Sequence, residues 1–178
     1  EIEDHVLGAT PTRGAGGPLH ISMNRNRTPL MDKLIEAGTQ AGVPQVRDMN
    51  EPPCEGIGYL PQTIWKGRRW SAAKAFLHPA RRRPNLTVVT GTEVRRILFD
   101  GKRAVGVACS FGRQPVEYRC HREIILTAGT LHSPKILQLS GVGPAEHLVR
   151  QGIAVVHDSP RLGHNMPEHL TFTIQFRL

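Results

Sequence analysis

The chain has 178 residues, of which 39% are hydrophobic and 5% aromatic, and it carries a formal net charge of +8 at pH 7. This length is that of one ordinary domain. No stretch approaches the roughly 20 apolar residues of a membrane-spanning helix, and apolar runs such as Leu86–Val89 and Ile124–Leu126 are too concentrated for a wholly disordered chain.

The first quarter of the chain predicts one strand and one helix. The alternation in Leu19–Ser22 is typical of a short strand. Thr28 followed by Pro29 predicts the start of a helix, and Gly42 predicts its end. The apolar face of this helix is predicted to consist of residues at helical spacing, Leu30, Leu34, Ala37 and Ala41.

The next segment predicts an irregular connection, a helix and then a change to strands. We expect the connection over residues 45–70 and a second helix that is capped by Ser71 and broken at Pro79. The β-branched runs that predict strands are Asn85–Thr90, Val94–Phe99, Ala104–Phe111 and Val116–Cys120. Asp100 and Gly101 predict a tight turn between the second and third of them.

The last third of the chain predicts alternating strands and helices. The continuous apolar run Glu123–Gly129 is typical of a strand covered on both faces, as in a parallel sheet. Ser133 and Pro134 predict the start of a helix, and Pro144–Gln151 predicts a second one. Two further strands are expected, at Ile153–His157 and at Leu170–Leu178. The pattern as a whole indicates an α/β (α+β) fold.

The excess of basic residues is concentrated in three short clusters, Lys66–Arg69, Arg81–Arg83 and Arg95–Arg96. No aromatic residues alternate with them at the regular spacing of a surface that stacks single-stranded bases. We therefore expect no nucleic-acid partner, and interpret the clusters as a solvated or ligand-facing surface. The charge alone leaves membrane association and oligomeric state open.

The three cysteines, Cys54, Cys109 and Cys120, are an odd number without a C-x-x-C pair. This spacing favours neither a disulfide framework nor a zinc site, so we expect no metal and an intracellular location, cytoplasmic or mitochondrial. The first residues do not resemble a secretory signal and do not begin with Met, which suggests a piece of a longer protein.

The segment Ile124–Gly143 carries the strongest functional signal. Small residues at the end of the predicted strand, Thr127–Gly129, let a ligand or a second backbone come close. Ligands of open α/β sheets bind at the carboxyl ends of strands, beside the N-termini of the helices that follow. A strand–turn–helix without any ligand is the alternative that spacing alone leaves open.

Five blocks of the chain, in order, resemble the glucose–methanol–choline (GMC) oxidoreductases, and the choline dehydrogenase branch in particular. The most specific is AGTLHSPKILQLSGVG, which is similar to the second signature of that family. The blocks are Gly16–Ser22, Lys66–Ala80, Arg83–Val107, Ala128–Gly143 and Gly152–Asn165.

The resemblance implies an FAD-binding site and no catalytic residue in this chain. At the position of Val94 the family contacts the FAD adenine through the backbone, although a core strand residue is equally compatible with this position. The family strand that lies beside FAD ends at Ala128 and Gly129, and the expected site extends to Thr127 and Ser133. The block around Ser71 lies near the cofactor in the family, and the alternative is that Ser71 only caps a helix.

The segment Gly163–His169 departs from the family pattern at Pro167 and Glu168, so no cofactor role is assigned to it. His169 matches in position but is not the family's catalytic base. The glycine fingerprint for the FAD diphosphate and the catalytic histidine belong to family regions before and after these residues. We therefore expect a central fragment that alone catalyses nothing.

The resemblance implies part of a Rossmann-like FAD-binding domain together with strands of an antiparallel-sheet substrate domain. The expected division is residues 1–47 in the substrate domain, 48–83 in a connection near the cofactor, 84–152 in the FAD domain and 153–178 returning to the substrate domain. The implied activity is oxidation of a primary alcohol, choline-like or another small polar one, to an aldehyde. Alternatives are an inactive truncated product or interaction module, and a fragment of a family lyase such as a hydroxynitrile lyase.

Overall fold

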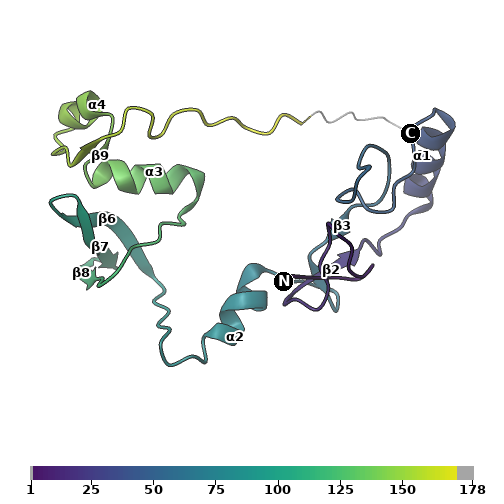
Figure 1. The fold of residues 1–178 in the computed structure, drawn as a ribbon, viewed down its shortest axis with the longest axis horizontal. Helices are drawn as coiled ribbons and strands as arrows, with labels where there is room; N and C mark the ends of the chain where they lie inside the picture. The colour runs from purple at the N-terminus through teal and green to yellow at the C-terminus, as the bar shows by residue number, and fades with distance from the viewer. Residues whose placement is uncertain (1, 172–178) are drawn as a thin grey trace. The chain divides into compact units, whose positions relative to one another are not determined.

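The computed structural model describes residues 2–171. The chain divides into two compact units, one up to Val88 and the other from Val89 onward, and each combines short strands with helices (Figure 1). The mixed α/β character expected from the sequence is confirmed. Among the described residues, no helix has the length and apolar character needed to cross a bilayer. The division into four segments stays a prediction.

The first unit is built around a small three-stranded sheet. Its order is β1-β2-β3, with β1 parallel and β3 antiparallel to β2, and β4 and β5 form a separate hairpin. The elements are β1 (Glu3–His5), β2 (Leu19–Met23), α1 (Pro29–Gln40), β3 (Pro61–Gln62), β4 (Ile64–Trp65), β5 (Arg68–Arg69), the π-helical turn η1 (Ala73–Leu77) and α2 (His78–Ala80). The irregular connection expected over residues 45–70 therefore contains three strands, each too short to show a periodicity in the sequence.

Helix α1 begins where the sequence predicts, but it buries a different face. The Thr28 hydroxyl accepts a hydrogen bond from the Met31 N–H at 3.3 Å, as expected of an N-cap. Only Ile35 is buried, and all four residues of the predicted apolar face are exposed. Gly38 lies on the Ile35 side, where Ile57 comes close enough that a β-carbon would lie 2.9 Å from its Cδ1. The helix thus packs through Ile35 and Gly38.

The second helix continues through the proline that was expected to break it. Ser71 accepts a hydrogen bond from the Lys74 N–H at 3.4 Å, in agreement with a capping role. Pro79 lies within α2, directly after the wider turn η1. A proline near the start of a helical segment sacrifices few hydrogen bonds, because the first-turn N–H groups need no helical partner.

A buried group of charged side chains ties the N-terminal loop of the first unit to residues 48–51. Arg13 Nη1 donates to Asp48 Oδ2 at 2.8 Å and to Glu51 Oε2 at 2.7 Å. The side chains of Arg13 and Asp48 are 9% and 3% exposed, and His5 Nε2 lies 3.7 Å from Asp48 Oδ2. Burial raises the pKa of Asp48, but the Asn50 N–H and the Arg13 guanidinium outweigh it, and the net pKa lies below the ordinary 3.8.

Replacing Asp48 by asparagine is expected to weaken the acid sensitivity of the first unit. Because the folded-state pKa is lowered, the carboxylate stabilises the fold above 3.8, and this contribution is lost as the pH falls through the folded-state value. Thermal unfolding followed by circular dichroism between about pH 2 and pH 6 measures this. We expect Asp48→Asn to melt several degrees lower at neutral pH and to lose less stability on acidification. Equal acid dependence in Asp48→Asn and in the unmodified chain would contradict this role. The exposed carboxylate variant Glu55→Gln, in the same unit, is the matched control.

The second unit is built on a three-stranded antiparallel sheet of order β6-β7-β8. Its elements are β6 (Thr92–Asp100), β7 (Arg103–Phe111), β8 (Gln114–Arg119), α3 (Gly129–Leu139), β9 (Val142–Gly143), α4 (Ala145–Arg150) and β10 (His157–Asp158). These strands confirm three of the four β-branched runs. Asp100 pairs with Arg103, so the two-residue turn is Gly101–Lys102, one position later than predicted.

Three other predicted strands are wrong or incomplete. Asn85–Thr90 and Glu123–Gly129 form no strand, and of Ile153–His157 only the last residue joins a strand. Strands exist only where a neighbour completes their hydrogen bonds, and the described residues provide none for the first two segments. Ile125 is consequently 77% exposed despite its apolar side chain. The predicted strand Leu170–Leu178 falls mostly outside the described residues.

Helix α3 packs against β6 and starts earlier than predicted. It begins at Gly129, so Pro134 lies inside it, and Ser133 accepts a hydrogen bond from the Ala128 N–H at 3.1 Å instead of capping the helix. Ile136 is buried, and the Ser140 hydroxyl, also buried, accepts from the Ile97 N–H of β6 at 2.7 Å. The serine therefore joins the C-terminal end of α3 to the sheet.

The Ser140–Gly143 segment, part of the most specific sequence block, has a structural role here. The Gly141 carbonyl accepts hydrogen bonds from the N–H groups of Val156 at 2.7 Å and His157 at 3.1 Å. Strand β9 then pairs in parallel with β10. Asp158 of β10 in turn accepts from the Ala145 N–H at the start of α4 at 2.9 Å. These bonds hold α3, α4 and the last strand as one body.

Candidate functional site

A cavity of about 510 Å³ lies in the second unit, between β6, the segment before α3 and α3 itself. This volume is in the range of small-molecule sites. The lining residues are Thr92, Glu93, Val94, Arg95, Ile125, Leu126, Thr127, Ala128, His132, Lys135, Ile136 and Leu139. Its larger apolar lining residues come from three places: Val94 from the strand, Ile125 and Leu126 from the segment before α3, and Ile136 and Leu139 from the helix.

Three of the five residues predicted as a site from the sequence meet in this cavity. Val94, Thr127 and Ala128 line it together, although more than 30 residues separate Val94 from the other two. Gly129 follows Ala128 as the first residue of α3, with φ +83° and no atom within 4 Å of where a β-carbon would be. Ser133 is not among the lining residues; it holds the turn through the Ala128 N–H. The cofactor role of all five stays a prediction.

The cavity lies along an unpaired edge of the sheet. β6 pairs with β7 on one side, and none of residues 2–171 forms a strand on its other side. The register of the β6–β7 pair shifts between Val94 and Arg96. Such irregularities are frequent next to binding sites, because they redirect the backbone. The Ile97 N–H of β6 is already bonded to Ser140, and the part of the edge beside Val94, a residue that is 36% exposed, is the part that faces the cavity.

One face of helix α3 lines the cavity. Two polar residues of this face, His132 and Lys135, were not predicted from the sequence as site residues. The four lining residues of this face follow the i, i+3, i+4 and i+7 spacing of a helix; they are His132, Lys135, Ile136 and Leu139. Had the helix been expected to start at Gly129, this spacing would have placed His132 and Lys135 on the side of Ile136. Because the helix was predicted to start at Ser133, the sequence did not indicate that His132 and Lys135 share this face.

The charges at the cavity are unevenly matched. Glu93 and Arg95 form an ion pair at 3.0 Å, and Arg95 also donates to the Ser110 hydroxyl at 3.3 Å. Within residues 2–171, no acidic side chain forms an ion pair with Lys135. The cavity therefore combines apolar walls with one uncompensated cation on the helix.

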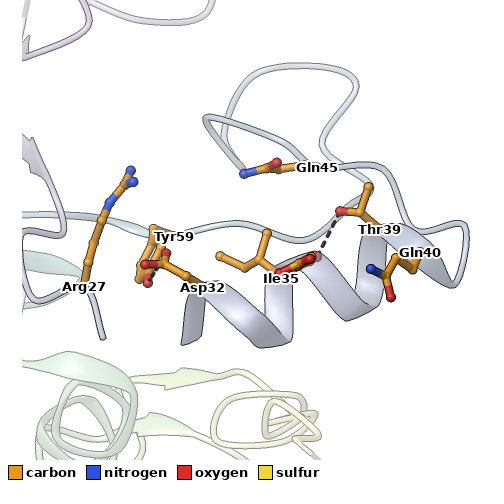
Figure 2. Close-up of a pocket in the computed structure, with 8 residues that line it drawn as sticks. Arg27, Asp32, Ile35, Thr39, Gln40, Gln45 and Tyr59 are labelled. Carbon is orange, nitrogen blue, oxygen red and sulfur yellow. Dashed lines mark hydrogen bonds between the residues drawn. The ribbon is translucent and has the colours of Figure 1, made fainter. Parts of the chain in front are cut away.

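A second hollow, of about 440 Å³, lies beside α1 in the first unit (Figure 2). Tyr59 donates to Asp32 Oδ1 at 3.0 Å, and the Arg27 guanidinium lies 5.0 Å from the centre of the Tyr59 ring. Burial and then Asp32 raise the pKa of Tyr59. These polar groups already bond to one another. The hollow therefore offers a ligand fewer free polar groups than the cavity beside β6 does.

The cavity beside β6 is suited to holding a flat ring. The apolar faces of Val94, Ile136 and Leu139 suit an aromatic ring, and the free strand edge suits its hydrogen-bonding edge. No group of three or more His, Cys, Asp or Glu side chains capable of holding a metal lies in the part of the chain that the structure describes.

Comparison with known proteins gives one consistent result. The sequence model of the family described as GMC oxidoreductase matches residues 2–171. The oxygen-dependent choline dehydrogenase of Brucella ovis is 47% identical over 174 residues, which cover 98% of this chain and 32% of that protein.

Solved structures agree with the sequence comparison. Pyridoxine 4-oxidase from Mesorbium loti superimposes with a TM-score of 0.80 at 36% identity, over 89% of this chain and 31% of that one. An FAD-dependent oxidoreductase from Chaetomium thermophilum gives a TM-score of 0.78 at 29% identity, over 89% and 30% of the two chains. The chain thus spans about a third of the length of these proteins.

Proposed function

This chain belongs to the GMC oxidoreductase family, and from that premise we propose that it forms part of an FAD-dependent alcohol oxidoreductase. Its cavity beside β6 would hold the adenine end of FAD. The observation that supports this is the meeting of Val94 with Thr127 and Ala128 in one cavity, from segments far apart in sequence.

The residues present fit an adenine ring. Val94 and Ile136 supply apolar surfaces of the kind that pack against a flat ring, and Ala128 has too small a side chain to fill the space. The unpaired edge of β6 carries backbone donors and acceptors, which suit the hydrogen-bonding edge of adenine.

FAD, when bound, supplies the ring that oxidises an alcohol carbon by taking up a hydride. The residues of this chain would bind and orient it: Val94 through the backbone, Thr127 and Ala128 through the cavity floor, and Ser133 by fixing the turn. No catalytic residue is assigned to this chain. The proposed substrate class is a small polar primary alcohol, with choline as the first candidate because of the name of the Brucella ovis relative.

We further propose an intracellular location. The three cysteines are free thiols in the structure, a state that persists in reducing compartments. Fractionation of cells that produce the tagged chain tests this; recovery from the extracellular medium would contradict it.

Flavin binding by the purified chain tests the proposal directly. We expect FAD to bind about tenfold or more tightly than FMN or riboflavin, because only FAD contains the adenine that the cavity beside β6 would hold. Quenching of flavin fluorescence measures the affinities, and ADP is expected to compete with FAD. We expect no decrease of flavin absorbance when choline is added to the FAD-loaded chain without oxygen, since no catalytic group is assigned here.

Equal binding of FAD and FMN, or no binding of either, would show that the proposal is wrong. The second result would favour the alternative of an inactive interaction module. One observation favours this alternative. The apolar residues Ile125 and Leu131 are 77% and 66% exposed, as in a surface that binds another protein.

A further inference from the structure

We propose that Lys135 is an affinity-determining residue of the cavity beside β6 and makes it select a phosphorylated adenine compound over the uncharged nucleoside. This inference rests on the proposed function and adds to it the charge that the site requires of its ligand. It concerns a residue for which the sequence motif alone indicates no role.

Lys135 is the basic residue of the cavity beside β6 that no acidic side chain among residues 2–171 pairs with. Of its four residues that can carry charge, Glu93 and Arg95 are paired with each other at 3.0 Å and contribute no net charge. Lys135 carries a full positive charge and has no acidic partner among the described residues. His132 adds a ring that can donate or accept hydrogen bonds one helical turn earlier.

Lys135 lies on the face of α3 that lines the cavity. Lys135 lies between His132 and Ile136 on the cavity face of α3, so the charge borders the apolar wall rather than the outer side of the helix. A ring placed against Val94 and Ile136 would lie on the same face of α3 as Lys135.

The charge of Lys135 is expected to make the cavity discriminate between charged and uncharged ligands. A cation beside an apolar wall attracts a ligand with a flat ring and an anionic tail, and it gives no advantage to the same ring without the tail. ADP, AMP and the adenylate part of FAD share this chemistry, and adenosine lacks only the charge. The comparison of ADP with adenosine therefore isolates the contribution of Lys135 from that of the ring.

Isothermal titration of the chain with ADP and with adenosine, at low and high salt, tests the inference. We expect ADP to bind about fivefold more tightly than adenosine at low salt, and this advantage to shrink at high salt because the charges are screened. Lys135→Met is expected to lower the affinity for ADP to about that for adenosine, and Lys135→Arg is expected to retain most of the difference between them. Lys102→Met, in the exposed β6–β7 turn, is the control for loss of one positive charge.

The outcomes separate the two proposals. If ADP and adenosine bind equally to the unmodified chain, or if Lys135→Met behaves like Lys102→Met, the role of Lys135 is overturned while the adenine site stands. If neither compound binds, the adenine site itself is wrong, and the role of Lys135 falls with it. Circular dichroism of Lys135→Met, compared with the unmodified chain, distinguishes a loss of binding from a loss of fold at this exposed residue.

Discussion

Replacing Gly141 by alanine is expected to lower the free energy of unfolding of the second unit by about 4 kcal/mol or more. The residue has φ +87°, where an L side chain is strained, and a β-carbon would clash with the Ala154 carbonyl oxygen and lie 2.9 Å from Val156 Cγ2. The backbone would have to move, and the bonds from Val156 and His157 to the Gly141 carbonyl would break. Denaturant unfolding followed by circular dichroism measures the loss.

Gly152→Ala is the matched control for this substitution. Gly152 also has a positive φ, +70°, but nothing lies within 4 Å of its β-carbon position. The cost there is the backbone strain alone, about 1 kcal/mol. Similar losses in the two variants would mean that steric closeness at Gly141 is unimportant and that the Ser140–Gly143 segment does not hold the unit together.

Replacing Ala128 by phenylalanine is expected to weaken FAD binding by about 30- to 150-fold. The new ring would occupy the cavity beside β6, and the adenine would lose the apolar contact area there, roughly 100 Å² and 2–3 kcal/mol. Ala128 is exposed and its φ is −85°, so the larger residue fits the backbone and the variant is expected to fold. Fluorescence titration with FAD gives the affinity.

Thr130→Phe adds a similar side chain two positions along α3, at an exposed residue that does not line the cavity. We expect its FAD affinity to stay within about twofold of the unmodified chain. An Ala128→Phe variant that still binds FAD normally would remove the cavity from consideration as the adenine site. The prediction is independent of Lys135, whose contribution is a matter of charge.

The elements that could be predicted from the sequence are those whose signals are local. The N-cap of α1 depends on Thr28 and Pro29 alone, and the three-stranded sheet on alternating β-branched residues with Gly101 at a turn. Helix α4 similarly follows from a short apolar pattern that ends at Gly152. In each case, neighbouring residues determine the backbone without help from distant ones.

The elements that were missed depend on what lies beside them. The run Glu123–Gly129 has the composition of a buried strand, but the described residues provide no strand to pair with it, so it forms none and Ile125 is exposed. Helix α1 turns Ile35 rather than Leu34 inward because Ile57, far along the chain, packs against that side. Helix α3 starts at Gly129, and Ser133, the predicted cap, accepts a hydrogen bond from the Ala128 N–H instead. Composition carries no information on such partners.

The candidate site divides in the same way. The identity of its small residues, Ala128 and Gly129, and the resemblance of the surrounding blocks to a flavoprotein family are properties of the sequence alone. That Val94 and Ala128 line one cavity, and that the same helix face brings Lys135 to it, was decided only by the packing of α3 on β6 through Ile136 and Ser140. Residue types are encoded one position at a time, whereas a cavity exists only when distant segments pack together.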